Sequence, residues 1–128
     1  MSGSSVVLDS DFLSAFLKTD RLPLVKGFYQ VEHLLVPPAV FREVSQTSLL
    51  EAIGLASQHP DSVLLMNDSR ARREAIQRGI RVVDIPAFLL TCKLSGFLDR
   101  AQIAETVRDL QERDRYGFRA DVLARLLG

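Results

Sequence analysis

Short apolar runs alternate with helix-patterned segments along this chain, and that alternation constrains its fold most. The runs cover residues 6–8, 33–36, 62–66 and 81–84. In the segments between them, apolar residues recur at the spacing of amphipathic helices. Strands that alternate with helices predict a parallel sheet covered by helices. We therefore expect a three-layer α/β fold, in which a short parallel sheet of about four strands is flanked by helices.

Turn and cap residues between the runs support this prediction. Pro38 suits the first turn of a helix through "AVFREV", and Ser48–Glu51 is a capping-box pattern that opens another helix. Gly79 ends a helix before the fourth run, and Gly96 ends the one that follows it. Asp99 caps the next helix, and "ADVLARLL" forms the last one. The second half of the chain is thus predicted to be mainly helical.

Length, charge and cysteine content limit the class of protein. The 128 residues suit a single domain over 1–128, in which we expect 1–5 ("MSGSS") to be a flexible segment and not a secretory signal. No apolar run approaches the ~20 residues of a membrane helix, so we expect a cytoplasmic protein. Lys plus Arg and Asp plus Glu both number 16, so nucleic-acid binding would need locally clustered basic residues. The single cysteine, Cys92, lies in an apolar stretch and is predicted to be a buried, inert thiol.

An acidic residue follows each predicted strand. Asp9 and Asp11 come after the first run, Glu43 lies in the helix after the second, Asp68 follows the third and Asp84 ends the fourth. Ligands of open parallel sheets bind outside the carboxyl ends of the strands, where these residues would meet. Clustered carboxylates repel one another, and a hard divalent cation relieves that repulsion. The sequence therefore predicts a Mg²⁺ or Mn²⁺ site at this edge.

Each acidic residue also has a structural interpretation. Asp9 and Asp68 could each cap a helix, and Asp11 would favour the positive end of a helix dipole in the first turn. Glu43 could be an exposed helix residue. Asp84 has no capping box after it, and as a candidate site residue we rank it below the other acidic residues. The prediction of a site rests on the edge that these residues share.

Two segments resemble blocks of the PIN domains, which are metal-dependent ribonucleases that include VapC-type toxins. "VVLDSDFLSAFL" resembles the opening strand of that family, with Asp11 where an asparagine usually stands. "LLVPPAVFREV" resembles the second block, which brings in Glu43. The stretch 51–99 is similar to a branch of small prokaryotic PIN-like proteins, which also carry a terminal "GFR" element, here Gly117–Arg119.

The resemblance implies an endoribonuclease of the VapC toxin type, with RNA as substrate and an antitoxin protein or a second copy of the chain as candidate partners. Asp9, Glu43 and Asp68 would be the catalytic metal ligands, with Asp11 and Glu51 as further candidates. One or two Mg²⁺ or Mn²⁺ ions would activate water to attack an RNA phosphodiester. No histidine base is expected.

Two departures from the family pattern concern the metal ligands. The segment that follows Glu43 is much shorter than in the family. The family also implies a third acidic residue where this chain has Leu49. Glu51 points about 200° away from Leu49 around a helix and is not expected to replace it. We therefore expect weak Mg²⁺ binding and slow or absent cleavage.

Two basic clusters could hold RNA phosphates near the acidic edge. The alternative is that they are solvated helix surface. Tyr116 and Phe118 could stack on bases, although core packing is the simpler expectation. The basic residues are Arg70, Arg72 and Arg73 in the first cluster and Arg113, Arg115 and Arg119 in the second.

Two other functions are compatible with the sequence. A PIN-like module that has lost catalysis could bind protein or RNA, as the leucine at position 49 indicates. A phosphotransferase similar to the haloacid dehalogenase family would use Asp9 as nucleophile and Asp11 as general acid. That family needs a lysine and a second acid near Asp68, and no lysine of this chain is well placed for it: Lys18, Lys26 and Lys93.

Overall fold

The computed structural model of the protein describes residues 5–36, 53–56 and 61–128. Within these residues the sheet has three parallel strands in the order β1 (Val6–Leu8), β2 (Val63–Leu65) and β3 (Arg81–Val83). Val6 pairs with Val63, and Val63 pairs in turn with Arg81. The α/β class and the parallel sheet are thus confirmed, with one strand fewer in the described residues than predicted.

The missing strand is the predicted run over residues 33–36. Only Leu35 pairs with the sheet, through a parallel bridge to Val7. Its amide donates to the carbonyl of Val6 (2.8 Å) and its carbonyl accepts from the amide of Leu8 (3.0 Å). The prediction of a full strand here was wrong, because a ladder needs several consecutive residues to pair and here only one does.

The helices begin and end near the predicted cap residues. Helix α4 gives way to Gly79 in a left-handed conformation (φ 77°), and α5 to Gly96 in the same conformation (φ 80°). Asp99 and Gln102 form a capping box at the start of α6. Residues 53–56 are also helical. The helices are α1 (Ser10–Lys18), α2 (Leu22–Tyr29), α4 (Ser69–Gln77), α5 (Ile85–Leu94), α6 (Arg100–Arg113) and α7 (Ala120–Leu127).

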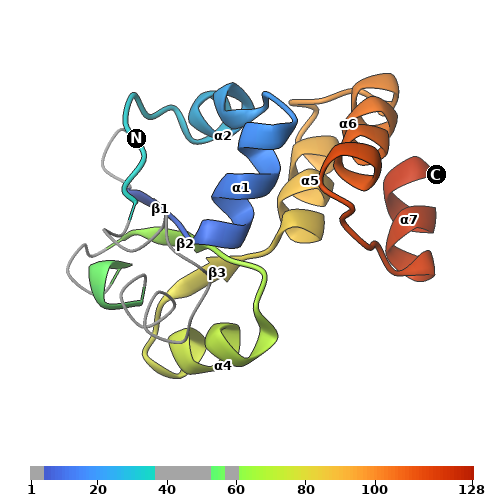
Figure 1. Ribbon diagram of the computed structural model, residues 1–128. Coiled ribbons are helices and arrows are strands. Elements are labelled where there is room, and N and C mark those ends of the chain that lie inside the picture. The colour runs from blue at the N-terminus through green and yellow to red at the C-terminus, as the bar shows by residue number, and fades with distance from the viewer. Residues whose placement is uncertain (1–4, 37–52, 57–60) are drawn as a thin grey trace.

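The sheet separates two apolar clusters, because successive side chains of a strand point to opposite faces. Val6 and Leu8 face a core formed with α1, α2, α5, α6 and α7, in which the rings of Phe12 and Phe16 stack with centroids 4.7 Å apart. Val7 faces the other side, where Ala75 of α4 and the helical residues 53–56 cover the sheet. Figure 1 shows these three layers, with α4 on one side of the sheet and α1 on the other.

Several sequence predictions can be placed against this fold. Cys92 is buried, as predicted, and burial raises the pKa of its thiol to about 12. The helices predicted at Pro38 and at Ser48–Glu51 lie outside the described residues. No helix in the described parts of the chain is both long and apolar enough to cross a membrane.

Candidate functional site

Each of the strands β1, β2 and β3 leads into an aspartate that begins a helix. Asp9 follows β1 at the N-cap of α1, Asp68 follows β2 at the N-cap of α4, and Asp84 follows β3 at the N-cap of α5. Because the strands are parallel and adjacent, these aspartates lie along one edge of the sheet, which we call the carboxyl edge. Asp9 and Asp68 lie near enough there for their charges to interact, and Asp84 lies at the same edge.

Asp9 differs from the other two aspartates in that its side chain does not cap its helix. It occupies the N-cap position, yet its side chain makes no capping hydrogen bond. The residue is 1% exposed, and its Oδ2 atom is buried without a hydrogen-bond partner among the described residues. Buried carboxylate oxygens normally have partners, so this atom is one that can accept a further partner.

The surroundings of Asp9 disfavour its charged form. The pKa of this carboxyl is raised to about 6, mainly by burial and also by the nearby charges of Asp11 and Asp68, while the amides of Ser10 and Asp11 act in the opposite direction. Asp11 also has a raised pKa, because of burial first and then the charges of Asp68 and Asp114. These acidic residues thus lie close enough to repel one another, as a cation site requires.

Asp68 and Asp84 do cap their helices. Oδ1 of Asp68 accepts from the amide of Ala71 at 2.9 Å, and Oδ1 of Asp84 accepts from the amide of Ala87 at 2.9 Å. Asp84 caps α5 without a capping box, because a cap needs only a side-chain acceptor near the N3 amide. Asp84 also forms an ion pair with Arg72, with Oδ2 and Nη1 3.0 Å apart.

A polar network that the sequence did not predict adjoins these aspartates. Oδ1 of Asn67 accepts from the amide of Ile85 at 3.0 Å and from the hydroxyl of Tyr116 at 3.4 Å. Burial raises the pKa of Tyr116 to about 12; the charges of Asp84 and Asp114 also raise it, and that of Arg72 lowers it. The segment after α6 therefore reaches the carboxyl edge.

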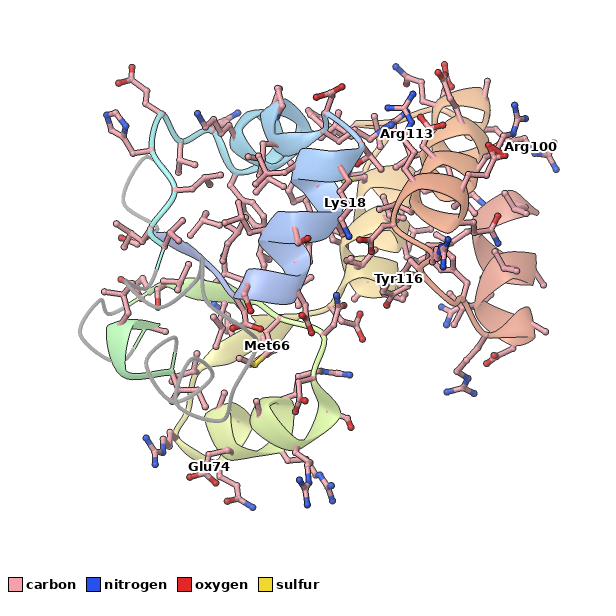
Figure 2. The ribbon with its side chains drawn as sticks, in the orientation of Figure 1. Lys18, Met66, Glu74, Arg100, Arg113 and Tyr116 are labelled. Carbon is pink, nitrogen blue, oxygen red and sulfur yellow. The ribbon has the colours of Figure 1, made fainter. Side chains whose placement is uncertain are left out.

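Asp114 lies in that same segment and is held by α1. Its Oδ1 atom is 3.1 Å from Nζ of Lys18, which extends from α1 toward this segment in Figure 2. Asp114 was not among the predicted site residues. Its only signal in the sequence was the charged stretch "RDRYGFR", in which we considered only the arginines and the aromatic residues.

The predicted metal ligands are only partly within the described residues. Glu43, Glu51 and Leu49 lie outside them. Among the described residues, no three His, Cys, Asp or Glu side chains are arranged so that they alone could hold a metal ion. The donor chemistry of Asp9, Asp11 and Asp68 nevertheless fits Mg²⁺ or Mn²⁺, because both ions prefer carboxylate oxygens and Oδ2 of Asp9 has no other partner.

The predicted phosphate-binding arginines differ in their surroundings. Arg72 is half-buried at the carboxyl edge, and the other five side chains are exposed, which also fits the solvated-surface interpretation. Arg119 forms an ion pair with Asp121 at 3.0 Å. The rings of Tyr116 and Phe118 lie 4.7 Å apart and pack against the core, which favours packing over base stacking for both. His33 is exposed.

Comparison with known proteins identifies the family of this chain. The sequence model of the PIN domain matches residues 50–127, which is more than half of the chain. The match includes Asp68, Asp84 and Tyr116, whereas Asp9 precedes it. Searches of curated proteins and of solved structures gave no significant match. The parallel sheet with acidic residues at its carboxyl edge and the family match agree, and the chain belongs to the PIN-domain family.

Proposed function

We propose that this PIN-domain protein is a Mg²⁺- or Mn²⁺-dependent endoribonuclease of the VapC toxin type. The observation that carries the proposal is the buried, unpartnered Oδ2 atom of Asp9 at the carboxyl edge, beside two further carboxylates. The toxin role implies RNA as the substrate, an antitoxin protein as partner and work in the cytoplasm, with a homodimer as a candidate assembly.

Asp9 and Asp68 would hold the metal ion together with Glu43, and Asp11 and Glu51 are the further candidates. The bound ion would supply an activated water and stabilise the leaving oxygen of the phosphodiester. The chain itself contributes the rest. Burial keeps bulk water away from Asp9, and the cap bond to Ala71 fixes the side chain of Asp68.

Basic residues would bind the RNA backbone beside these carboxylates. Arg72 is held at the carboxyl edge by Asp84 and could orient a phosphate with its remaining donors. Arg113 and Arg115 flank Asp114 in the segment that Tyr116 connects to β2. Phosphate contacts of this kind supply affinity and register but little sequence preference.

The test is Mn²⁺ titration and RNA cleavage with Asp9→Asn and a matched control. Asn has nearly the same size and shape as Asp and is equally tolerated at an N-cap, so the variant should fold, lose Mn²⁺ binding and lose any Mn²⁺-dependent cleavage. The control is Asp99→Asn, which makes the same change at the N-cap of α6. Equal Mn²⁺ binding by Asp9→Asn and wild type would refute the metal site.

A non-catalytic PIN-like module is the second candidate. It is favoured by Leu49, which stands where the family resemblance implies an acidic residue, and by the lack of a complete ligand set among the described residues. Leu49→Asp separates the two candidates. If the wild type binds Mn²⁺ weakly and this substitution tightens binding and increases cleavage, the site is a nuclease site that lacks one carboxylate. If neither changes, the binding module is the better description.

A further inference from the structure

A cavity of about 340 Å³ lies between the turn that joins α1 to α2 and the N-terminal half of α6, and it is open to solvent on one side. This volume is at the lower end of the range for ligand pockets. Asp9 precedes α1 at the carboxyl edge, and Asp20 follows the other end of the same helix at the cavity. The cavity is therefore separate from the acidic site.

The free charge of the cavity lining is negative. Asp20 and Glu105 both line it, both are exposed, and neither side chain has a hydrogen bond or ion pair with another described residue. The only basic residue of the lining, Arg21, is already paired with Asp109 at 2.7 Å and also donates to Oγ1 of Thr106 at 3.0 Å. The guanidinium charge is therefore compensated.

The helix ends at the cavity contribute partial charges of both signs, because α1 ends there while α2 and α6 begin there. The α1 helix stops beside it, so the negative end of that helix dipole adds to the carboxylates. Asp20, just past this end, adopts a left-handed conformation (φ 55°) and adds a negative charge where a helix dipole disfavours one. The opposite wall holds the start of α6, where the capping box of Asp99 and Gln102 already occupies backbone amides. The free side-chain charges of the lining, on Asp20 and Glu105, would repel an anionic ligand such as a phosphate.

The rest of the lining combines aliphatic surface with the polar side chains of Thr19, Gln102 and Thr106. Leu98, which is 4% exposed, and Leu24 provide aliphatic surface beside the carboxylates, together with Pro23. The Arg21–Asp109 ion pair connects the two walls across the cavity. An aliphatic wall next to unpaired carboxylates suits a side chain with an alkyl stem and a cationic end, as lysine and arginine have.

We propose that this cavity is a docking site for a partner protein, which inserts a lysine or arginine with its stem against Leu24 and Leu98 and its charge at Asp20 and Glu105. The exposure of the two carboxylates favours a protein over a free amine. Ion pairs in open solvent contribute little, and a partner that covers the cavity mouth strengthens them by excluding water.

The test uses random hexapeptides displayed on phage and selected against the full chain. We expect enrichment of a lysine or arginine next to an aliphatic residue. The strongest peptide is then titrated into ¹⁵N-labelled protein, where it should shift the amides of residues that line the cavity. A version with norleucine in place of lysine keeps the stem and loses the charge, and it should bind about fivefold more weakly or worse.

Variants of the protein test whether the carboxylates of Asp20 and Glu105 bind the lysine of the peptide. The Asp20→Asn, Glu105→Gln double variant should weaken the lysine peptide by at least about fivefold, while its affinity for the norleucine peptide changes little. The variant should keep its fold, since asparagine also tolerates the left-handed conformation. Glu112→Gln, an exposed acidic residue of α6 outside the cavity lining, is the matched control and should have no effect.

Four results would overturn the proposal. These are the absence of any enriched basic sequence, binding that shifts amides elsewhere in the protein, equal affinity for the lysine and norleucine peptides, and equal affinity of wild type and double variant. Two small probes exclude the other occupants. Butylamine bound as tightly as the peptide would mean a site for free amines, and inorganic phosphate that shifts the cavity amides would contradict the charge argument.

Discussion

The hydroxyl of Tyr116 donates to Oδ1 of Asn67 across 3.4 Å and so joins the segment after α6 to the end of β2. The same oxygen accepts from the amide of Ile85 at 3.0 Å, at the start of α5. One side chain thus connects three segments at the carboxyl edge, directly before Asp68. The hydroxyl keeps its proton for this bond well beyond neutral pH, since burial and nearby charges raise the pKa of Tyr116 from 10 to about 12.

Tyr116→Phe tests this connection. The hydrogen bond is longer than the usual 2.7–2.8 Å for hydroxyl donors, so its loss should lower the free energy of unfolding by about 1 kcal/mol or less, measured by urea denaturation. If the connection also positions Asp68, Mn²⁺ affinity should fall. The control is Tyr29→Phe, since that half-buried tyrosine is away from the carboxyl edge. Equal Mn²⁺ affinity in both variants would limit Tyr116 to a packing role.

Asp9→Asn should change how stability depends on pH in the absence of divalent ions. The pKa of Asp9 is about 6 in the folded protein against a model value of 3.8, so the folded state binds the proton more tightly than the unfolded state. Ionisation of Asp9 therefore lowers stability as pH rises from about 4 through 6.

At pH 7 the metal-free Asp9→Asn variant should be the more stable protein, by up to about 3 kcal/mol, and this advantage should disappear near pH 4. Urea denaturation of both proteins at the two pH values measures the difference. A difference that stays constant between them would mean that the environment of Asp9 does not oppose its charge.

Gly79→Ala should destabilise the protein by about 1 kcal/mol, because Gly79 ends α4 with a φ of 77° that alanine adopts only with strain. Space is not the obstacle, since nothing lies within 4 Å of an added Cβ. The contrasting variant is Gly54→Ala, at a helical position that also has nothing within 4 Å. It should stabilise the protein by about 0.5–1 kcal/mol. Thermal melting of the pair checks both signs.

Replacing three arginines of the second basic cluster with glutamine should flatten the salt dependence of RNA binding. Each phosphate contact on a single strand contributes about 0.7 to the slope of log K against log salt, so the loss of three contacts should reduce it by about 2. The control replaces Arg100, Arg108 and Arg125 with glutamine, which changes the net charge of the protein by the same amount. If the two variants show equal slopes, the arginines of the second basic cluster are solvated surface and do not bind phosphates. These arginines are Arg113, Arg115 and Arg119.

The sequence by itself determined the elements and their class, because local chemistry decides them. The apolar runs at 6–8, 62–66 and 81–84 are β1, β2 and β3 with at most two extra residues each. Gly79 and Gly96 end helices because they reach a left-handed conformation without strain, and Asp99 starts one because its carboxylate accepts a backbone amide. Parallel strands then place Asp9 and Asp68 at one edge.

Tertiary structure alone decided what each acidic residue does there. Asp9, Asp68 and Asp84 are the same residue type at the same N-cap position, yet only Asp9 is buried with an unpartnered oxygen, while the other two cap their helices. Burial depends on which distant segments pack nearby, and no local pattern encodes it.

The same reason applies to the polar network and to the cavity. Tyr116 reaches Asn67 across 49 positions, and Arg21 reaches Asp109 across 88, so neither contact has a local signature. The run at 33–36 shows the converse, since its composition suits a strand but only Leu35 finds a partner in the sheet. Composition sets which groups are available, and only packing decides which of them meet.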